Sequence, residues 1–247
     1  MKKIFTIGIA AGLIFLLAAC GKTEKEKITI SAAASLNEVL SQIVENYQKE
    51  NKNVKIDINF GASGALKKQI EEGAPVDFVF FASKKDLEDL KKKNLISEKY
   101  SKDILENTLI IAGRKKIDSL SEMLDHKVAM GDPEIVPAGK YAKQVLENEG
   151  LWDRMQENFV FSKDVRSAMQ YVDLYEVDYA VIYKTESKVM KNAAIVYEIP
   201  TELHEPIIYS CGILKDKERD EVKDFYKYLT KEQSVEIFNK FGFKVKK

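Results

Sequence analysis

The stretch KVAMGDPEIVPAGKYAKQVLENEG, residues 127–150, opens as a short apolar strand, passes through a run of turn residues and closes as a helix. Two groups of turn residues, GDP (131–133) and PAG (137–139), stand where that helix begins. Neither group is needed merely to reverse the chain, and the start of a helix leaves backbone N–H groups without partners inside the helix. The stretch therefore predicts a strand, a tight loop and a helix whose first turn is available to a ligand.

The same order of strand, tight loop and helix continues in both directions along the chain from Ile28. Short apolar runs alternate with segments whose apolar residues recur at helical spacing, a pattern typical of α/β proteins with a largely parallel sheet. No Ser/Gly linker separates two domains laid end to end, so a two-lobed chain would cross between its lobes more than once. Strands are expected at 27–35, 54–60, 76–82, 108–113, 127–131, 179–183, 193–199 and 206–214, and helices at 36–50, 64–73, 138–148, 165–176, 218–230 and 231–243.

The N-terminus has the features of an export signal. Two lysines precede an apolar run over residues 4–17, which is short for a bilayer span and ends in small residues. The ending LAAC (17–20) resembles a bacterial lipobox, which implies a signal peptide at 1–19, an acylated Cys20 and a lipidated tether at 20–27. The alternative is an ordinary cleaved signal with an incidental cysteine. We expect an extracytoplasmic protein that is lipid-anchored to the bacterial cell membrane through Cys20.

The charge balance excludes one large class of partners. Basic and acidic residues both number 39, so the formal net charge is zero. Lysine clusters such as KKK (91–93) have acidic neighbours, which favours a solvated helix face over a nucleic-acid patch. We therefore expect no nucleic-acid partner. The second cysteine, Cys211, stands in the apolar run IIYSCGIL (207–214), where it is expected to pack as a small hydrophobe.

Four loop-to-helix junctions share small, polar or glycine residues at the point where a helix begins. A helix N-terminus carries unpaired N–H donors and about half a positive charge, so it attracts an anion without lysine or arginine. The alternative is that Ser35 and Ser63 only cap their own helices. Recurrence of the pattern, together with Gly61, Gly64 and Gly139, favours a small anionic ligand because glycine allows close approach to the backbone. The junctions are AAASLNE (32–38), FGASGALKK (60–68), IVPAGKYAK (135–143) and SKDVRSAM (162–169).

These junctions belong to an ordered set of motifs that resembles the molybdate-binding proteins of ABC uptake systems. The motifs are AAASL, FGASG.L..QIE.GAPVDFVF.AS, GDPE.VPAGKYA, DVR.A and YAVIY, and the likeness extends from about Ile28 to FGF near the C-terminus. The resemblance implies an α/β, two-lobed type II periplasmic-binding-protein fold, with the ligand cleft between lobes that are joined by crossing strands. It implies lobe I at 28–110 plus 206–247 and lobe II at 111–205.

The oxyanion ligands of that family fall on five positions, each of which carries a compatible residue: Ser35, Ser63, Ala138, Val165 and Tyr183. The resemblance implies hydroxyl and backbone donors from the serines, backbone N–H donors from Ala138 and Val165, and a hydroxyl from Tyr183. It further implies a binding protein for molybdate and tungstate, with an ABC permease and its ATPase subunit as partners. We expect a monomer, no enzymatic activity, no cofactor and no metal beyond the molybdate oxyanion.

Two other functions remain open. A sulfate-like oxyanion receptor would use the same fold. An exported serine hydrolase would require a base near Ser35 or Ser63. The stretch GASGA (61–65) resembles a nucleophile elbow only in part, because that motif requires glycine where Ala65 stands.

The remaining candidate catalytic and metal-binding residues favour structural interpretations. His126 and His204 are the two histidines, and both are expected in exposed turns. Two histidines without a cysteine cluster do not predict a transition-metal site. The stretch MGDPE (130–134) suggests carboxylates around calcium, but Asp132 precedes a proline and more simply starts a turn.

Overall fold

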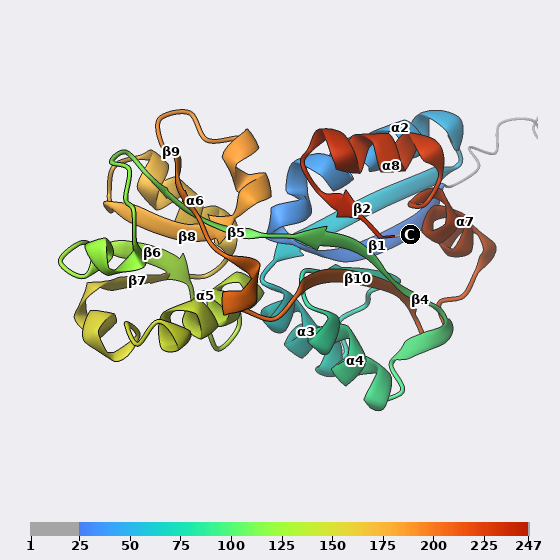
Figure 1. Cartoon of the computed structure of the whole chain (residues 1–247). Coiled ribbons are helices and arrows are strands. Elements are labelled where there is room, and N and C mark those ends of the chain that lie inside the picture. The colour runs from blue at the N-terminus through green and yellow to red at the C-terminus, as the bar shows by residue number, and fades with distance from the viewer. Residues whose placement is uncertain (1–24, 247) are drawn as a thin grey trace, which may run out of the picture.

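The computed structural model describes residues 25–246 and shows two α/β lobes joined by chain segments that cross between them (Figure 1). Lobe I is built on a six-stranded sheet and lobe II on a five-stranded sheet. The predicted signal peptide, Cys20 and most of the predicted tether lie outside the described residues. Within residues 25–246, no helix is both long enough and apolar enough to cross a membrane.

Lobe I is formed by the two ends of the described chain, and its strand order is β11-β4-β10-β3-β1-β2. Strand β1 pairs in parallel with β2 and β3, whereas β10 runs antiparallel between β3 and β4. The strands are β1 (Glu26–Ala33), β2 (Val54–Gly61), β3 (Phe78–Phe81), β4 (Ile96–Asn107), β10 (Ile207–Leu214) and β11 (Lys244–Val245). The helices are η1 (Ala34–Leu36), α2 (Asn37–Glu50), α3 (Ser63–Glu71), α4 (Lys84–Lys92), α7 (Asp220–Tyr228) and α8 (Glu232–Lys240).

Lobe II is formed by the middle of the chain, and its strand order is β7-β6-β8-β5-β9. Strand β6 pairs in parallel with β7 and β8, whereas β5 runs antiparallel to β8 and β9. The strands are β5 (Leu109–Gly113), β6 (Val128–Gly131), β7 (Phe159–Ser162), β8 (Tyr179–Tyr183) and β9 (Ala194–Glu198). The helices are η2 (Leu120–Met123), α5 (Pro137–Asn148), η3 (Asp153–Asn158), α6 (Val165–Asp173), η4 (Lys184–Lys188) and η5 (Thr201–Leu203).

Helical spacing of apolar residues gives α2 one buried face. In α2 the buried residues recur every three or four positions, and each buried aliphatic side chain contributes about 1.5–3 kcal/mol relative to exposure. Every residue of β3 and β10 is buried, and Cys211 packs within β10 as predicted. The buried residues of α2 are Val39, Leu40, Ile43, Val44 and Tyr47.

Within residues 25–246, the chain crosses between the lobes twice. Strand β4 ends in lobe I at Asn107, and β5 begins in lobe II at Leu109. The chain returns to lobe I between Glu198, the last residue of β9, and Ile207, the first residue of β10. The prediction that the chain crosses more than once is therefore confirmed.

The prediction of a largely parallel sheet was wrong, because both sheets are mixed. The antiparallel pairings involve β4, β5, β9 and β10, the strands on either side of the two crossings. The chain passes from lobe I to lobe II at the first crossing and returns at the second, so the strands of the two crossings run in opposite directions. Strand β4 was not expected at all. Its sequence ISEKYSKDILEN does not alternate between apolar and polar residues. Only Ile96-Ser97 and Ile104-Leu105 are buried, and the residues between these pairs are exposed or partly exposed.

Candidate functional site

The five residues predicted to bind the ligand line one small cavity between the lobes. Ser35 and Ser63 come from lobe I, after the ends of β1 and β2. Ala138, Val165 and Tyr183 come from lobe II, at the starts of α5 and α6 and at the end of β8. The structure thus brings together residues that are up to 148 positions apart, counted from Ser35 to Tyr183.

Four of these residues lie at the start of a helix. Ser35 lies in the 3₁₀ turn that leads into α2, and Ser63 is the first residue of α3. Ala138 is the second residue of α5, and Val165 is the first residue of α6. The first amides of a helix have no acceptor inside it, and each helix start carries about half a positive charge. The cavity therefore combines free N–H donors with a positive potential.

Two glycines allow the chain to pass from β6 into α5. A Cβ atom on Gly139 would lie 2.0 Å from the Gly131 carbonyl oxygen, and a Cβ atom on Gly131 would lie 2.3 Å from Val136 Cγ1. Both distances are too short for any side chain, so Gly139 contacts the backbone of Gly131 directly and Gly131 packs against the Val136 side chain. These contacts explain the glycines of the GDP and PAG groups.

The loop between β6 and α5 is held by Asp132. Its carbonyl oxygen accepts a hydrogen bond of 2.8 Å from the Val136 N–H, and its Oδ1 accepts one of 2.9 Å from the Glu134 N–H. The prediction of a turn at Asp132 is confirmed. Pro137 begins α5, where its missing N–H costs no helical hydrogen bond. Ala138 is then the first residue of α5 with an N–H to offer, and it lines the cavity.

Neither serine caps its own helix, so the capping alternative is wrong. Ser35 Oγ lies 2.9 Å from the Tyr209 hydroxyl oxygen. Ser63 Oγ accepts a hydrogen bond of 3.0 Å from the Ala82 N–H, just after β3. A serine hydroxyl has one hydrogen to donate besides its lone pairs, so Ser63 keeps its hydrogen for another partner.

The hydroxyl of Tyr183 is buried and has no hydrogen-bond partner among residues 25–246. The side chain is 1% exposed and ends β8 at the cavity. Burial raises the pKa of Tyr183 well above 10, so the hydroxyl stays protonated and can donate. An unpaired buried hydroxyl costs about 1–3 kcal/mol, which a ligand acceptor would remove.

Charged side chains near the cavity have partners within the protein. Asp164 lines the cavity, but its Oδ1 accepts a hydrogen bond of 2.8 Å from the Ser167 N–H and caps α6. Arg166 pairs with Glu38 of lobe I and, at 3.1 Å between Nε and Oε2, with Glu186 of lobe II. Within residues 25–246, neither lysine nor arginine lines the cavity. An anion in this cavity would therefore be held by uncharged donors.

The two lobes touch directly beside the cavity. The Gly64 N–H of α3 donates a hydrogen bond of 3.1 Å to the Ile135 carbonyl oxygen of lobe II. The ion pair between Arg166 and Glu38 also spans the two lobes. Its second carboxylate, Glu186, is 1% exposed, and burial raises the pKa of Glu186 to about 7 although Arg166 opposes that change. The structure is thus a closed arrangement of the lobes.

The geometry does not support a serine hydrolase. The hydroxyl partners of Ser35 and Ser63 within residues 25–246 are a tyrosine and a backbone amide, and neither is a histidine. His126 is partly exposed in a surface bend, with Nδ1 3.4 Å from Asp178 Oδ2. Residues 25–246 contain no group of three or more side chains that could hold a metal ion.

The prediction that His204 lies in an exposed turn was wrong. The side chain is only 8% exposed, and its Nδ1 lies 2.7 Å from the Glu205 carbonyl oxygen. The ring packs near Tyr141 of α5, with 5.9 Å between ring centroids. The segment that returns to lobe I, between Glu198 and Ile207, therefore packs against lobe II. The sequence around His204 does not indicate this packing.

Two residues of the site were missed in the sequence, Tyr209 and Asn107. Tyr209 is fully buried in β10 beside Ser35, although the two are 174 positions apart. Asn107, the last residue of β4, donates a hydrogen bond of 3.2 Å to the Tyr209 hydroxyl. One signal was present, since a tyrosine inside the apolar run IIYSCGIL needs a partner for its buried hydroxyl.

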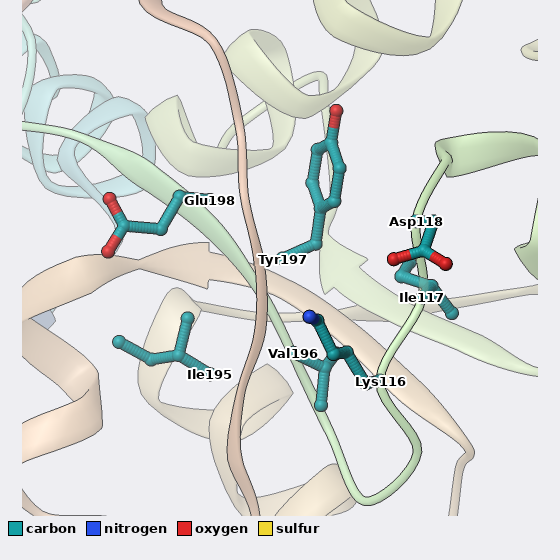
Figure 2. Close-up of a pocket in the computed structure, with 7 residues that line it drawn as sticks. All are labelled: Lys116, Ile117, Asp118, Ile195, Val196, Tyr197 and Glu198. Atoms are coloured by element: carbon teal, nitrogen blue, oxygen red, sulfur yellow. The ribbon is translucent and has the colours of Figure 1, made fainter.

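A larger and more open depression lies on lobe II, away from the cavity (Figure 2). It is lined by residues 116–118 and by residues 195–198 of β9, an edge strand of the sheet. In Figure 2 the carboxylates of Asp118 and Glu198 lie on opposite sides of it. None of the five predicted residues lines this depression. Its side chains do not converge on one point, so its size alone does not make it a binding site.

Comparison with known proteins assigns the chain to a family. The family described as bacterial extracellular solute-binding protein matches residues 28–244. The Bacillus subtilis protein YvgL, provisionally named an ABC transporter substrate-binding lipoprotein, is 40% identical over 257 residues, covering 98% of this chain and 99% of YvgL. The molybdate-binding protein ModA of Haemophilus influenzae is 32% identical over 256 residues, covering 100% of this chain and 99% of ModA.

A solved structure shares the fold. The periplasmic molybdate-binding protein of Azotobacter vinelandii superposes with a TM-score of 0.81 at 22% identity, covering 89% of this chain and 100% of that chain. The two-lobed architecture and the match over nearly all described residues lead to the same conclusion. This chain belongs to the family of bacterial extracellular solute-binding proteins.

Proposed function

We propose that this protein is the extracytoplasmic substrate-binding component of an ABC importer for molybdate and tungstate, and that it binds its substrate without transforming it. The observation that carries the proposal is the buried Tyr183 hydroxyl, unpaired within residues 25–246, at a cavity where four helices begin. The similarity to the Haemophilus influenzae molybdate-binding protein supports the choice of oxyanion.

In this proposal each predicted residue donates hydrogen to the anion. Ser35 and Ser63 supply hydroxyl groups and backbone N–H groups, Ala138 and Val165 supply backbone N–H groups, and Tyr183 supplies its hydroxyl. Uncharged donors held by the fold can surround an anion without a paired cation, as at other helix N-termini. Asp164, the one carboxylate that lines the cavity among residues 25–246, accepts a hydrogen bond from the Ser167 N–H through its Oδ1.

A site made of donors selects a fully deprotonated dianion. Monohydrogen phosphate would bring a proton that meets other donors, leaving a desolvated polar group unpaired at a cost of roughly 1–3 kcal/mol. Sulfate has no proton to misplace, but it is smaller than molybdate. A cavity sized for molybdate would hold some donors beyond good hydrogen-bond distance from sulfate. Phosphate is therefore rejected by its chemistry and sulfate by its size.

A thermal-shift titration of the ligand-free protein with four anions tests the proposal. A ligand that binds only the folded state raises the melting temperature as its concentration exceeds Kd. We expect molybdate and tungstate to raise it strongly and sulfate and phosphate to do little at equal concentration. Stabilisation by sulfate equal to that by molybdate would instead identify a sulfate-like receptor.

Closure of the lobes connects binding to transport in this proposal. A ligand stabilises the closed form only through contacts that are better there than in the open form. The cavity receives donors from both lobes, so an anion held by all of them favours closure, which an ABC permease and its ATPase subunit could detect. For the lobes we keep the boundaries 28–110 plus 206–247 and 111–205, and we expect a monomer.

We also propose that Cys20 carries a lipid anchor. The support is the sequence LAAC and the similarity to YvgL, whose name includes the word lipoprotein. A diacylglyceryl group supplies firmer anchoring than one acyl chain. Cys20→Ser should release the protein from the membrane fraction and leave molybdate binding unchanged. Fractionation with labelled fatty acid checks this, and a variant that still carries label would refute the anchor.

A further inference from the structure

The hydroxyl of Ser35 is part of a hydrogen-bond chain that begins at the crossing between the lobes. Ser35 Oγ lies 2.9 Å from the Tyr209 hydroxyl oxygen, and the same oxygen lies 3.2 Å from Asn107 Nδ2. Tyr209 is fully buried and Ser35 is nearly so. We call Asn107, Tyr209 and Ser35 the hinge chain. The distances alone leave open whether Ser35 or Tyr209 donates in the first of these bonds.

The orientation of the Asn107 amide settles that direction. Asn107 Oδ1 accepts a hydrogen bond of 2.9 Å from the Thr108 N–H, a backbone group that can only donate. The other end of the amide is therefore the NH₂ group. It lies 2.9 Å from Thr185 Oγ1 and 3.2 Å from the Tyr209 hydroxyl oxygen, and it can only donate to them. The backbone of the crossing thus fixes which way the amide faces.

The donor role then passes along the hinge chain. Because Tyr209 accepts from Asn107, its own hydrogen is free to donate, and Ser35 Oγ is the acceptor beside it. Burial raises the pKa of Tyr209 well above 10, so that hydrogen is present. If Ser35 donated instead, the Tyr209 hydrogen would be left buried without an acceptor. With Tyr209 donating, the Ser35 hydrogen turns to the cavity that Ser35 lines.

We propose that Asn107 and Tyr209 are positioning residues that fix Ser35 as a hydrogen-bond donor to the anion and thereby exclude protonated anions. This inference rests on the proposed function for the identity of the anion. Ser63 is the internal reference, because its Oγ accepts from the Ala82 backbone N–H, a donor that no side-chain substitution removes. The hydroxyl of Ser63 is thus oriented by a backbone group, and the hydroxyl of Ser35 is oriented by two side chains.

Asn107→Asp reverses the hinge chain with almost no change in shape. The new carboxylate still accepts from the Thr108 N–H, but it now also accepts from the Tyr209 hydroxyl. Tyr209 can then only accept from Ser35, and Ser35 presents a lone pair to the cavity. Molybdate and monohydrogen phosphate both carry two negative charges, so the added charge at residue 107 opposes both alike.

The first experiment is calorimetry of wild type and Asn107→Asp with molybdate and with phosphate, at a pH where phosphate is mainly the monohydrogen dianion. We expect the variant to lose about tenfold more affinity for molybdate than for phosphate, since one charge-assisted donor is lost only for molybdate. Thr185→Val is the matched control. It removes the other acceptor of Asn107 Nδ2, leaves the hinge chain in place and should keep the ratio of the two affinities. An equal loss for both anions in Asn107→Asp would overturn the proposal.

A double-mutant cycle separates positioning from a general structural effect. Tyr209→Phe should weaken molybdate binding about tenfold in the wild-type background and have little effect in a Ser35→Ala background. A merely structural tyrosine would weaken binding equally in both.

Neutron diffraction of the deuterated, ligand-free protein shows whether Ser35 or Tyr209 donates the hydrogen bond between them. The expected deuteron lies on Tyr209 and points at Ser35 Oγ, whereas a Ser35 deuteron that points at Tyr209 would overturn the proposal. If wild-type protein binds no molybdate, the proposed function fails, and the deuteron position still decides the hinge chain.

Discussion

The hydroxyl groups at the cavity differ between the two lobes in whether they have a hydrogen-bond partner. In lobe I, the hydroxyls of Ser35 and Ser63 each contact a group of their own lobe. In lobe II, the Tyr183 hydroxyl has no partner among residues 25–246. The lobe I hydroxyls therefore take part in the fold whether or not a ligand is present, whereas the lobe II hydroxyl is satisfied only when something fills the cavity. Under the proposed function, lobe I therefore offers a preformed half-site, and lobe II supplies the gain on closure.

The largest expected effect comes from breaking the lobe II half-site at its backbone. Gly139→Ala places a methyl group 2.0 Å from the Gly131 carbonyl oxygen, so either β6 or α5 must move. We expect the free energy of unfolding to fall by about 3 kcal/mol or more and molybdate binding to be lost. Urea denaturation measures the first effect and calorimetry the second.

Gly61→Ala is the matched control in lobe I. Gly61 lines the same cavity, but a Cβ atom there would lie 3.4 Å from Leu66 Cδ2, an ordinary packing distance. We expect a change within about 0.5 kcal/mol. Equal losses in the two variants would mean that the β6–α5 contact is no tighter than the lobe I junction.

The next largest effect is expected at the Tyr183 hydroxyl. Tyr183→Phe removes a donor that has no partner among residues 25–246, so the free energy of unfolding should stay the same or rise slightly. Molybdate affinity should fall by about 1.5–3 kcal/mol, or ten- to a hundredfold. Calorimetry together with thermal denaturation measures both quantities. Unchanged affinity would mean that Tyr183 does not touch the ligand.

Ser63→Ala should behave differently from Tyr183→Phe. It removes a proposed ligand donor and also the acceptor of the buried Ala82 N–H. We therefore expect both affinity and stability to fall, each by about 1–3 kcal/mol. A variant that loses affinity alone would contradict the view that lobe I hydroxyls serve the fold as well as the ligand.

The lobes also differ in how pH affects one carboxylate of each, Glu186 in lobe II and Asp103 in lobe I. Burial raises the pKa of Glu186 in lobe II to about 7 from an unfolded value of 4.5. The folded state then holds more protons than the unfolded state between these values, so the contribution of Glu186 to stability is lost as pH rises from 4.5 to 7. Glu186→Gln removes this dependence. Urea denaturation at several pH values should show the wild type losing on the order of 1–3 kcal/mol relative to the variant over this range.

For Asp103 of lobe I, the change of stability with pH has the opposite sign. Burial would raise the pKa of Asp103, but hydrogen bonds of 2.6 Å from Ser210 and 2.9 Å from Lys84 hold it below its usual value. Its contribution is present above the unfolded pKa and is lost as pH falls through the folded value. The difference between wild type and Asp103→Asn should therefore stay flat between pH 4.5 and 7. A slope like that of Glu186→Gln would refute the assignment of the pH effect to lobe II.

The smallest expected effect concerns the contact between the lobes. Glu38→Gln removes the charge that lobe I presents to Arg166, and exposed or half-exposed ion pairs contribute about 1 kcal/mol or less. We expect molybdate to dissociate a few-fold faster, as measured by stopped-flow displacement, with an unchanged association rate. Glu198→Gln is the control, because Glu198 pairs with Lys184 at 2.8 Å within lobe II. Faster dissociation in both variants would show that general charge, rather than the interlobe pair, is responsible.

Local features of the chain predicted the elements that carry the site. Strand β8 has the predicted bounds, and α5 begins at Pro137, one residue before the predicted start. These elements are readable because their apolar spacing and turn residues act within a few positions. The gathering of Ser35, Ser63, Ala138, Val165 and Tyr183 at one cavity followed from the ordered motifs rather than from any spacing.

The remaining features depend on partners that are distant in sequence. Strand β4 is held by pairing with β10 about a hundred residues later, so its own polar sequence shows little strand character. The sequence suggests Ser35 as a helix cap because serine commonly caps helices. In the structure its hydroxyl is instead hydrogen-bonded to Tyr209, which is 174 positions away. His204 is buried by α5, which packs against it from more than fifty residues away.

The position of β10 has a consequence for the order in which the protein folds. This strand lies inside the lobe I sheet, with β3 on one side and β4 on the other, yet it is made after every strand of lobe II. Until residues 207–214 are available, β3 and β4 each keep an unpaired edge, which is the kind of edge that promotes aggregation. Lobe II has all the strands of its sheet by Glu198. The inserted lobe can therefore finish first, and the lobe that contains both chain ends is completed last.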